Sequence, residues 1–162
     1  MGAVIPNLDE VFAQIAKDIE ALEARMAKNI QALVLDADKH LKALTPVYTG
    51  SAVRNYIWTV GEPNAVTYDA IEDGPTGRTN SMALGQEPRR AANETAAMAS
   101  LLAIDFSNPF QTFYCTNLSP DIEGLELGLL PGPPLSSRSP NGMFGITEAY
   151  LEAKVASKGI TS

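Results

Sequence analysis

Few residues in this chain have the type and spacing that catalysis requires. His40 is the only histidine and Cys115 the only cysteine. A Cys/His zinc site needs more ligands than these, and a Ser-His-Asp or Cys-His arrangement would have to use His40, near the end of a charged helical segment. We interpret His40 as a surface histidine and Cys115 as a small core residue of an aromatic strand. The sequence predicts no catalytic residue, and we expect no enzyme activity.

Acidic residues and one glycine-rich stretch give no better candidates for a metal or a cofactor. Asp36 and Asp38 are two positions apart, so a helix would place them on different faces. The stretch at 74–79 lacks the lysine and the glycine spacing of a phosphate-binding loop. We expect no metal and no cofactor. The other acidic groups lie where nothing fixes their geometry: Glu72 with Asp73, and Asp121 with Glu123 and Glu126.

The charge balance argues against nucleic-acid binding. The net charge is -7 and the pI about 4.6, whereas binding to phosphates needs a basic face. A small basic spot comprises Arg78, Arg89 and Arg90, which we interpret as solvation of a helix end rather than a contact with DNA or an acidic partner. The sequence shows no signal peptide and no apolar stretch long enough to span a bilayer. We expect synthesis in a cytoplasm and no contact with a membrane.

The length of 162 residues fits one domain, 1–162, and 45% apolar residues are enough for a core. Its dominant element is a predicted helix over about 8–44, where apolar residues recur every 3.6 positions on average and no Gly or Pro intervenes. Such a helix is about 55 Å long, longer than a domain of this size. We expect it to project and to need a partner, unless it breaks near Asp36–Asp38.

The remaining pattern predicts an α+β fold with a small antiparallel sheet of about four strands, a middle helix and a C-terminal helix. Residues 73–88, rich in Gly and Pro, are predicted to form a mobile loop, and 129–140 to be irregular. The expected strands lie at 53–60, at 66–68 as the return of a hairpin, at 110–116, and at 122–127, which fits a helical turn equally well. The expected helices are 87–104 and 141–157.

Two sets of short motifs resemble the tail-completion, or head–tail joining (neck), proteins of long-tailed bacteriophages. The first resembles that family's Thr-Pro-Val-Asp-Thr-Gly motif before an arginine and an aromatic strand, although Tyr48 replaces the Asp. The second resembles an Asn at a strand end, a Pro-Tyr-Ala, a Glu-x-Gly and a Pro-x-Gly-Met before the last helix. Pro120 matches the start of Pro-Tyr-Ala, although Asp121 stands where its aromatic is expected. The matching residues are Thr45, Pro46, Val47, Thr49, Gly50, Asn117, Glu126, Gly128, Pro140, Gly142 and Met143.

The resemblance implies a structural virion protein that forms a ring, six subunits in our hypothesis, between the head and the tail. Its partners would be further copies of itself, head-side connector or adaptor proteins, and tail terminator or tail tube proteins, with DNA passing through the lumen without specific binding. Alternatives are a tail terminator or other head-completion protein, a small prophage-associated enzyme, or a helical adaptor. The candidate interface residues are Leu8, Phe12, Ile15, Leu129, Leu130, Pro133 and Leu135.

Overall fold

A computed structural model describes residues 7–72, 89–130 and 141–158. The predicted loop at 73–88 and the interface or motif residues Pro133, Leu135 and Pro140 lie outside these ranges. Within them the structure combines helices with a small sheet, in the order α1 (Leu8–Leu44), α2 (Ser51–Arg54), β1 (Ile57–Val60), α3 (Arg90–Leu102), β2 (Phe113–Thr116), α4 (Ile122–Glu126) and α5 (Phe144–Lys158).

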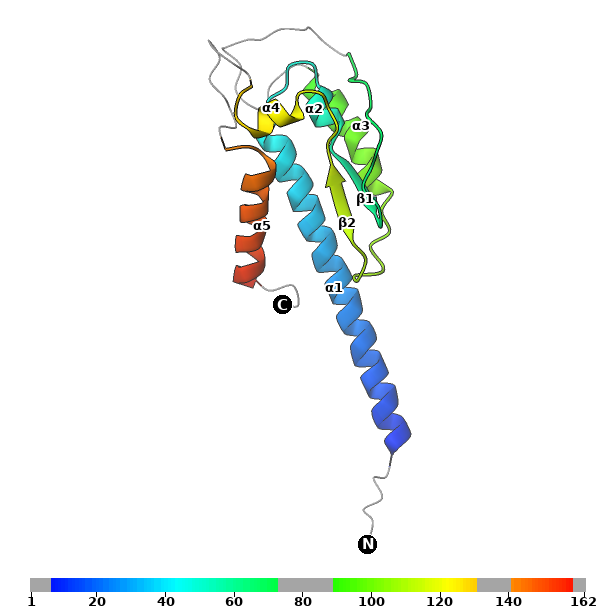
Figure 1. Cartoon of the computed structure of the whole chain (residues 1–162). Coiled ribbons are helices and arrows are strands. Elements are labelled where there is room, and N and C mark those ends of the chain that lie inside the picture. Colours follow the sequence, from blue (N-terminus) through cyan, green and yellow to red (C-terminus); the bar gives the residue numbers. More distant parts are fainter. Residues whose placement is uncertain (1–6, 73–88, 131–140, 159–162) are drawn as a thin grey trace.

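Helix α1 organises the molecule. It is continuous over 37 residues, so the alternative of a break near Asp36–Asp38 was wrong. Its C-terminal half lies between the sheet and α5, while its N-terminal half extends beyond every other element (Figure 1). The buried residues of the helix all fall in its C-terminal part, from Val34 to Lys42.

The sheet formed by the described residues has two antiparallel strands rather than about four. Strands β1 and β2 pair with Ile57 opposite Thr116 and Val60 opposite Phe113. Two of the expected strand segments have other structures: Val53 lies in α2, and 122–126 forms α4. The expected hairpin return at 66–68 is extended but does not join the sheet.

Two buried asparagine side chains hold this extended segment instead. The Asn55 amide accepts a hydrogen bond from Tyr68 N at 2.7 Å and donates one to Tyr68 O at 2.8 Å. The Asn93 amide bonds the backbone of Ile71 in the same way, at 2.8 and 3.0 Å. Because each amide offers one donor and one acceptor to a peptide unit, it substitutes for a neighbouring strand. A third strand is therefore not needed to satisfy these backbone groups.

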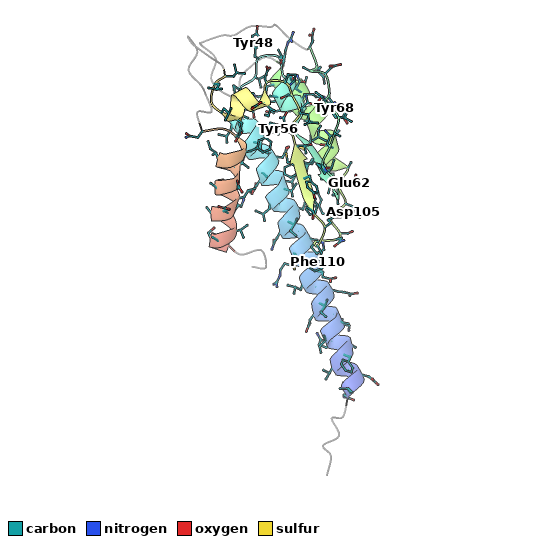
Figure 2. The ribbon with its side chains drawn as sticks, viewed as in Figure 1. Tyr48, Tyr56, Glu62, Tyr68, Asp105 and Phe110 are labelled. Atoms are coloured by element: carbon teal, nitrogen blue, oxygen red, sulfur yellow. The ribbon has the colours of Figure 1, made fainter. Side chains whose placement is uncertain are left out.

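The core lies where α1, the sheet, α3 and the N-terminal end of α5 meet. Tyr56 and Met143 are fully buried there, and Trp58 is 7% exposed. Figure 2 shows Tyr56 in the interior beside the upper part of α1, and its ring lies 5.8 Å from that of Phe144 at the start of α5. Helix α3 packs against β1 and α2, and α5 packs against α1.

Candidate interaction surface

The only histidine is half-buried and joins two helices. His40 Nδ1 on α1 and Thr147 Oγ1 on α5 lie 2.9 Å apart, and the imidazole stacks on Tyr150 with ring centroids 4.4 Å apart. Asp36, one turn earlier on α1, pairs with Lys154 of α5. The prediction of a surface histidine therefore holds only in part. Part of the His40 side chain is covered because α5, more than 100 positions later in the chain, packs against it.

Cys115 packs against the hydrophobic core, as expected. Burial raises the pKa of its thiol above the ordinary value, and the nearby Asp38 carboxylate acts in the same direction. A raised pKa keeps the sulfur protonated, which is the reverse of what a nucleophilic cysteine needs. Within the described ranges, no group of three or more His, Cys, Asp or Glu residues could hold a metal ion.

Stability should fall at alkaline pH, first through Cys115 and then through Tyr56, whose pKa burial also raises. The folded-state pKa of each acid exceeds its unfolded value, so its contribution is full below that value, 9.0 for Cys and 10.0 for Tyr, and is lost as pH rises further. Urea unfolding of the wild type and of Cys115→Ala would test this. The wild type should lose about 1 kcal/mol more than the variant between about pH 8.5 and 10. Parallel pH profiles would contradict the prediction.

The first set of motif residues builds the junction after α1. Thr45 Oγ1 donates to Leu41 O at 2.7 Å and lies 2.8 Å from the Tyr56 hydroxyl. Thr49 Oγ1 accepts the amide of Ser51 at 3.2 Å, at the start of α2. Pro46 and Val47 are partly buried. Gly50 has a φ of +93°, and a Cβ there would lie 2.3 Å from the Asn93 side chain, so the backbones of α2 and α3 approach closely only with glycine at this position.

The second set of motif residues joins α4 to the start of α5. The Glu126 carboxylate accepts hydrogen bonds from the amides of Met143, Phe144 and Gly145 at 2.7, 2.9 and 3.1 Å. These are N–H groups of the helix start that have no partner within the helix, and a carboxylate also interacts favourably with the helix dipole. The Pro-x-Gly-Met and Glu-x-Gly motifs therefore meet at one cap. Gly128 supplies a turn with a φ of +68°.

Asn117 completes the junctions, because its amide donates to Ala52 O at 2.7 Å and accepts from Ser119 N at 3.0 Å. Each described motif residue with a polar side chain thus bonds to backbone groups or to another core residue. Sequence reasoning placed these residues in turns and packing. It did not identify Glu126 as a helix cap, since the two motifs are separated in the chain by 131–140.

Gly142→Ala should destabilise the protein by about 2 kcal/mol or more. The residue has a φ of +77°, and a Cβ would lie 2.4 Å from Glu126 Oε1 and 2.6 Å from Glu126 O. Gly61→Ala is the matched control, because Gly61 has a φ of +81° with nothing within 4 Å of a new Cβ. It should cost only the backbone strain, about 1 kcal/mol. Urea unfolding of both variants separates the two contributions. Equal losses would show that the cap tolerates the added carbon.

The N-terminal half of α1 carries a series of large apolar side chains that the rest of the described chain leaves exposed. Figure 2 shows this part of the helix running past Phe110, the lowest labelled residue of the folded domain. Three of the predicted interface residues lie here, with exposures of 49% for Leu8, 59% for Phe12 and 48% for Ile15. The same face continues through residues that sequence reasoning left out of the interface, namely Val11, Ile19 and Leu22, at 47%, 51% and 40%. We call these six residues the α1 stripe.

The predicted interface residues after α4 divide between surface and interior. Leu129 is 66% exposed, next to Leu127 at 61%. Leu130 instead packs against the core, and its side chain occupies the space that a Cβ on Gly124 would enter. This difference could not be predicted from the sequence, because both leucines lie in the same irregular segment. Among the other exposed apolar residues, none of which was predicted as interface, Leu102 at 77% and Phe110 at 69% are the most exposed.

The structure brings the motif residues together but leaves the predicted interface residues in separate places. The α1 stripe lies at one end of the molecule and α4 at the other (Figure 1), and the Leu129 amide donates to Gly124 O of α4 at 2.8 Å. None of the helices in the described part combines the length and the apolar character needed to cross a bilayer. Comparisons with protein-family models, with curated proteins and with solved structures give no match to this chain.

Proposed function

We propose that this protein is a structural part of the bacteriophage neck, where a ring of its subunits joins the DNA-filled head to the tail. The observation that carries the proposal is the α1 stripe. Six large apolar side chains, each 40–59% exposed, lie on a helix held rigidly by the domain at its other end. An apolar surface of this kind marks a protein–protein contact. A protein whose work is to bind its neighbours would carry such an arm.

The motif residues support the same role. In the neck family, which the sequence resembles, the turns formed by these motifs would hold a rigid ring subunit together. Here Thr45, Glu126 and Asn117 fix helix ends and turns through hydrogen bonds to backbone groups. The partners proposed are neighbouring copies, head-side connector or adaptor proteins, and tail terminator or tail tube proteins. A net charge of -7 suits a lumen through which DNA passes without binding.

Electron microscopy of lysates from a phage lacking this gene tests the proposal. Filled heads and finished tails should lie apart, and supplying the protein should restore joined, infectious particles. Normal infectious particles without the gene would overturn the neck role. Tails of abnormal length would favour a tail terminator instead.

Ile15→Asp should abolish the rescue of such a lysate while leaving the fold intact. The side chain is 48% exposed on the α1 stripe, so a carboxylate there costs little in the free protein but would be buried without a partner in the assembled particle. We expect infectious titre to fall by about two orders of magnitude or more, with the unfolding midpoint within the range of ordinary surface changes.

Ala13→Asp is the matched control, because Ala13 is exposed on the other side of the same helix turn. It introduces the same charge, at a somewhat larger cost in helix propensity because alanine is the better helix former, and should rescue as well as the wild type. Equal titres for the two variants would show that the stripe has no part in joining.

A further inference from the structure

The spacing of apolar residues changes along α1 where the domain stops covering it. Within the α1 stripe, Leu8, Phe12, Ile15, Ile19 and Leu22 follow one another at steps of 4, 3, 4 and 3, a mean of 3.5. Beyond Leu22 the steps lengthen, because Met26 and Ile30 each follow at a step of four. A 3.5-residue repeat keeps one seam facing a second helix, whereas a longer repeat fits packing against a sheet and short helices. The uncovered part is thus patterned for a helix.

Carboxylates lie on both sides of the apolar seam that the α1 stripe forms along the helix. At 100° per residue, Glu23 lies about 60° from the seam on one side, and Asp18 lies about 80° from it on the other. Asp9 adds a further carboxylate on the same side as Glu23, about four turns earlier in the helix, and Arg25 is the one cation near a border. The two lysines, Lys17 and Lys28, project from the opposite side of the helix, about 160–180° away. Border positions select the partner through charge, so this seam favours a helix whose borders are basic.

Pairing with a second copy would place like charges together or meet an obstruction. In a parallel, in-register pair, Asp18 of each copy lies next to Glu23 of the other copy, so the pair contains two contacts between like charges. An antiparallel pair confined to 8–26 sets Asp18 against its own equivalent. A longer antiparallel overlap would set Asp18 near Arg25, but it brings Leu8 of the second copy level with Leu33. There α5 already lies along α1, as the Lys154–Asp36 pair one turn further on shows.

We infer that the α1 stripe binds a helix of a different protein, one with an apolar seam of 3.5-residue period and Lys or Arg at its borders. The stripe spans two heptads, too few for a free-standing coiled coil, but α1 is held in place by the domain and needs no partner to fold. This inference rests on the proposed function for the existence of a partner protein. It adds the chemical character of that partner. It also implies that contacts between copies in the ring use surfaces other than the α1 stripe.

Binding of two synthetic helical peptides to the full chain tests this inference. Both peptides carry Ile and Leu at the seam, and they differ only in having Lys or Glu at the border positions. The Lys peptide should bind about tenfold more tightly than the Glu peptide at low salt, with a difference that shrinks as salt screens the charges. Ile15→Asp should abolish binding of the Lys peptide, and Ala13→Asp should not.

A charge-reversed variant makes the test specific to the borders. Asp18→Lys combined with Glu23→Lys should reverse the preference, so that the Glu peptide binds more tightly. Failure of both peptides to bind, or an unchanged preference in the reversed variant, would overturn the inference. So would self-association of the wild type that Ile15→Asp abolishes in sedimentation, because a second copy would then cover the stripe. Normal particles without the gene would overturn the neck role but leave the peptide result standing.

Discussion

Asp38→Asn is expected to destabilise the folded protein by about 3–5 kcal/mol. Asp38 is 1% exposed, and its carboxylate accepts hydrogen bonds from Lys42 Nζ at 2.8 Å and from Trp58 Nε1 at 2.9 Å. Lys42 itself is 5% exposed. An asparagine has nearly the same shape and can still accept from the indole. The substitution leaves the Lys42 ammonium buried without a counter-charge, and this uncompensated charge is the cause of the expected loss of stability.

Asp36→Asn is the matched control, two positions earlier on the same helix. Asp36 also pairs with a lysine, Lys154, but the two side chains are 36% and 28% exposed. A solvated pair contributes about 0–1 kcal/mol. Urea unfolding followed by fluorescence of Trp58, the only tryptophan, measures both variants. Similar losses for the two substitutions would show that burial does not set the strength of the Asp38 pair.

The double variant Asp38→Asn with Lys42→Met extends this test. Removing both charges together leaves no uncompensated ion, and a methionine fills the space of the lysine stem. The double variant should therefore recover most of the stability that Asp38→Asn loses. Additive losses would mean that Lys42 stabilises the core through contacts other than its ion pair.

The sequence placed the two aspartates correctly on different faces of a helix, but it could not supply their partners. Periodicity describes one element at a time. Trp58 is 20 positions from Asp38 and Lys154 is 118 positions from Asp36, and each contact depends on how whole elements pack. The same limit applies to His40, whose stacking partner Tyr150 belongs to the last helix.

Elements with a long repeat were predicted well, and short ones were not. The bounds of α1 were predicted as about 8–44 and are Leu8–Leu44, because its apolar period persists for about ten turns. The strand expected at 53–60 covers the last two residues of α2 and all of β1, since Val53 and Ile57 are apolar in either structure. The hairpin return at 66–68 was predicted from the turn signal at 61–64. The buried Asn55 and Asn93 amides, which hold that segment away from the sheet, left no signal in its own sequence.

Exposure of the α1 stripe followed only in part from the sequence. Ile19 and Ala37 have the same place in the apolar repeat, yet Ile19 is 51% exposed and Ala37 is 4% exposed. The apolar repeat shows which face of the helix is apolar. How much of that face is covered depends on how far the rest of the domain extends along the helix. The comparison of helix length with domain size predicted that one end would project. It could not determine which residues would lie beyond the last contact.

Arg90→Met is expected to destabilise the protein by about 3 kcal/mol. The sequence suggested that Arg90 solvates a helix end, and this was wrong, because the residue is 6% exposed. Its guanidinium donates to Lys42 O at 2.8 Å and to Thr45 O at 2.7 Å, carbonyls at the C-terminus of α1. It also pairs with Glu94 at 2.8 Å. A cation at this position interacts favourably with the α1 dipole and donates to two carbonyls at the end of the helix, of which Lys42 O also accepts the amide of Thr45 at 3.2 Å.

Methionine keeps the apolar stem of Arg90 but removes every donor, so two buried carbonyls would lose a charged hydrogen bond at once. Arg90→Lys keeps the charge, but one ammonium cannot reproduce the fork that reaches both oxygens, and about half of the loss should remain. Arg25→Met, on the exposed part of α1, is the control and should change stability by about 0.5 kcal/mol or less. Urea unfolding ranks the three variants. If Arg90→Lys were as stable as the wild type, charge alone would account for the cap. If Arg90→Met matched Arg25→Met, the end of α1 would not depend on α3, and the junction that supports the projecting helix would have to be rigid for another reason.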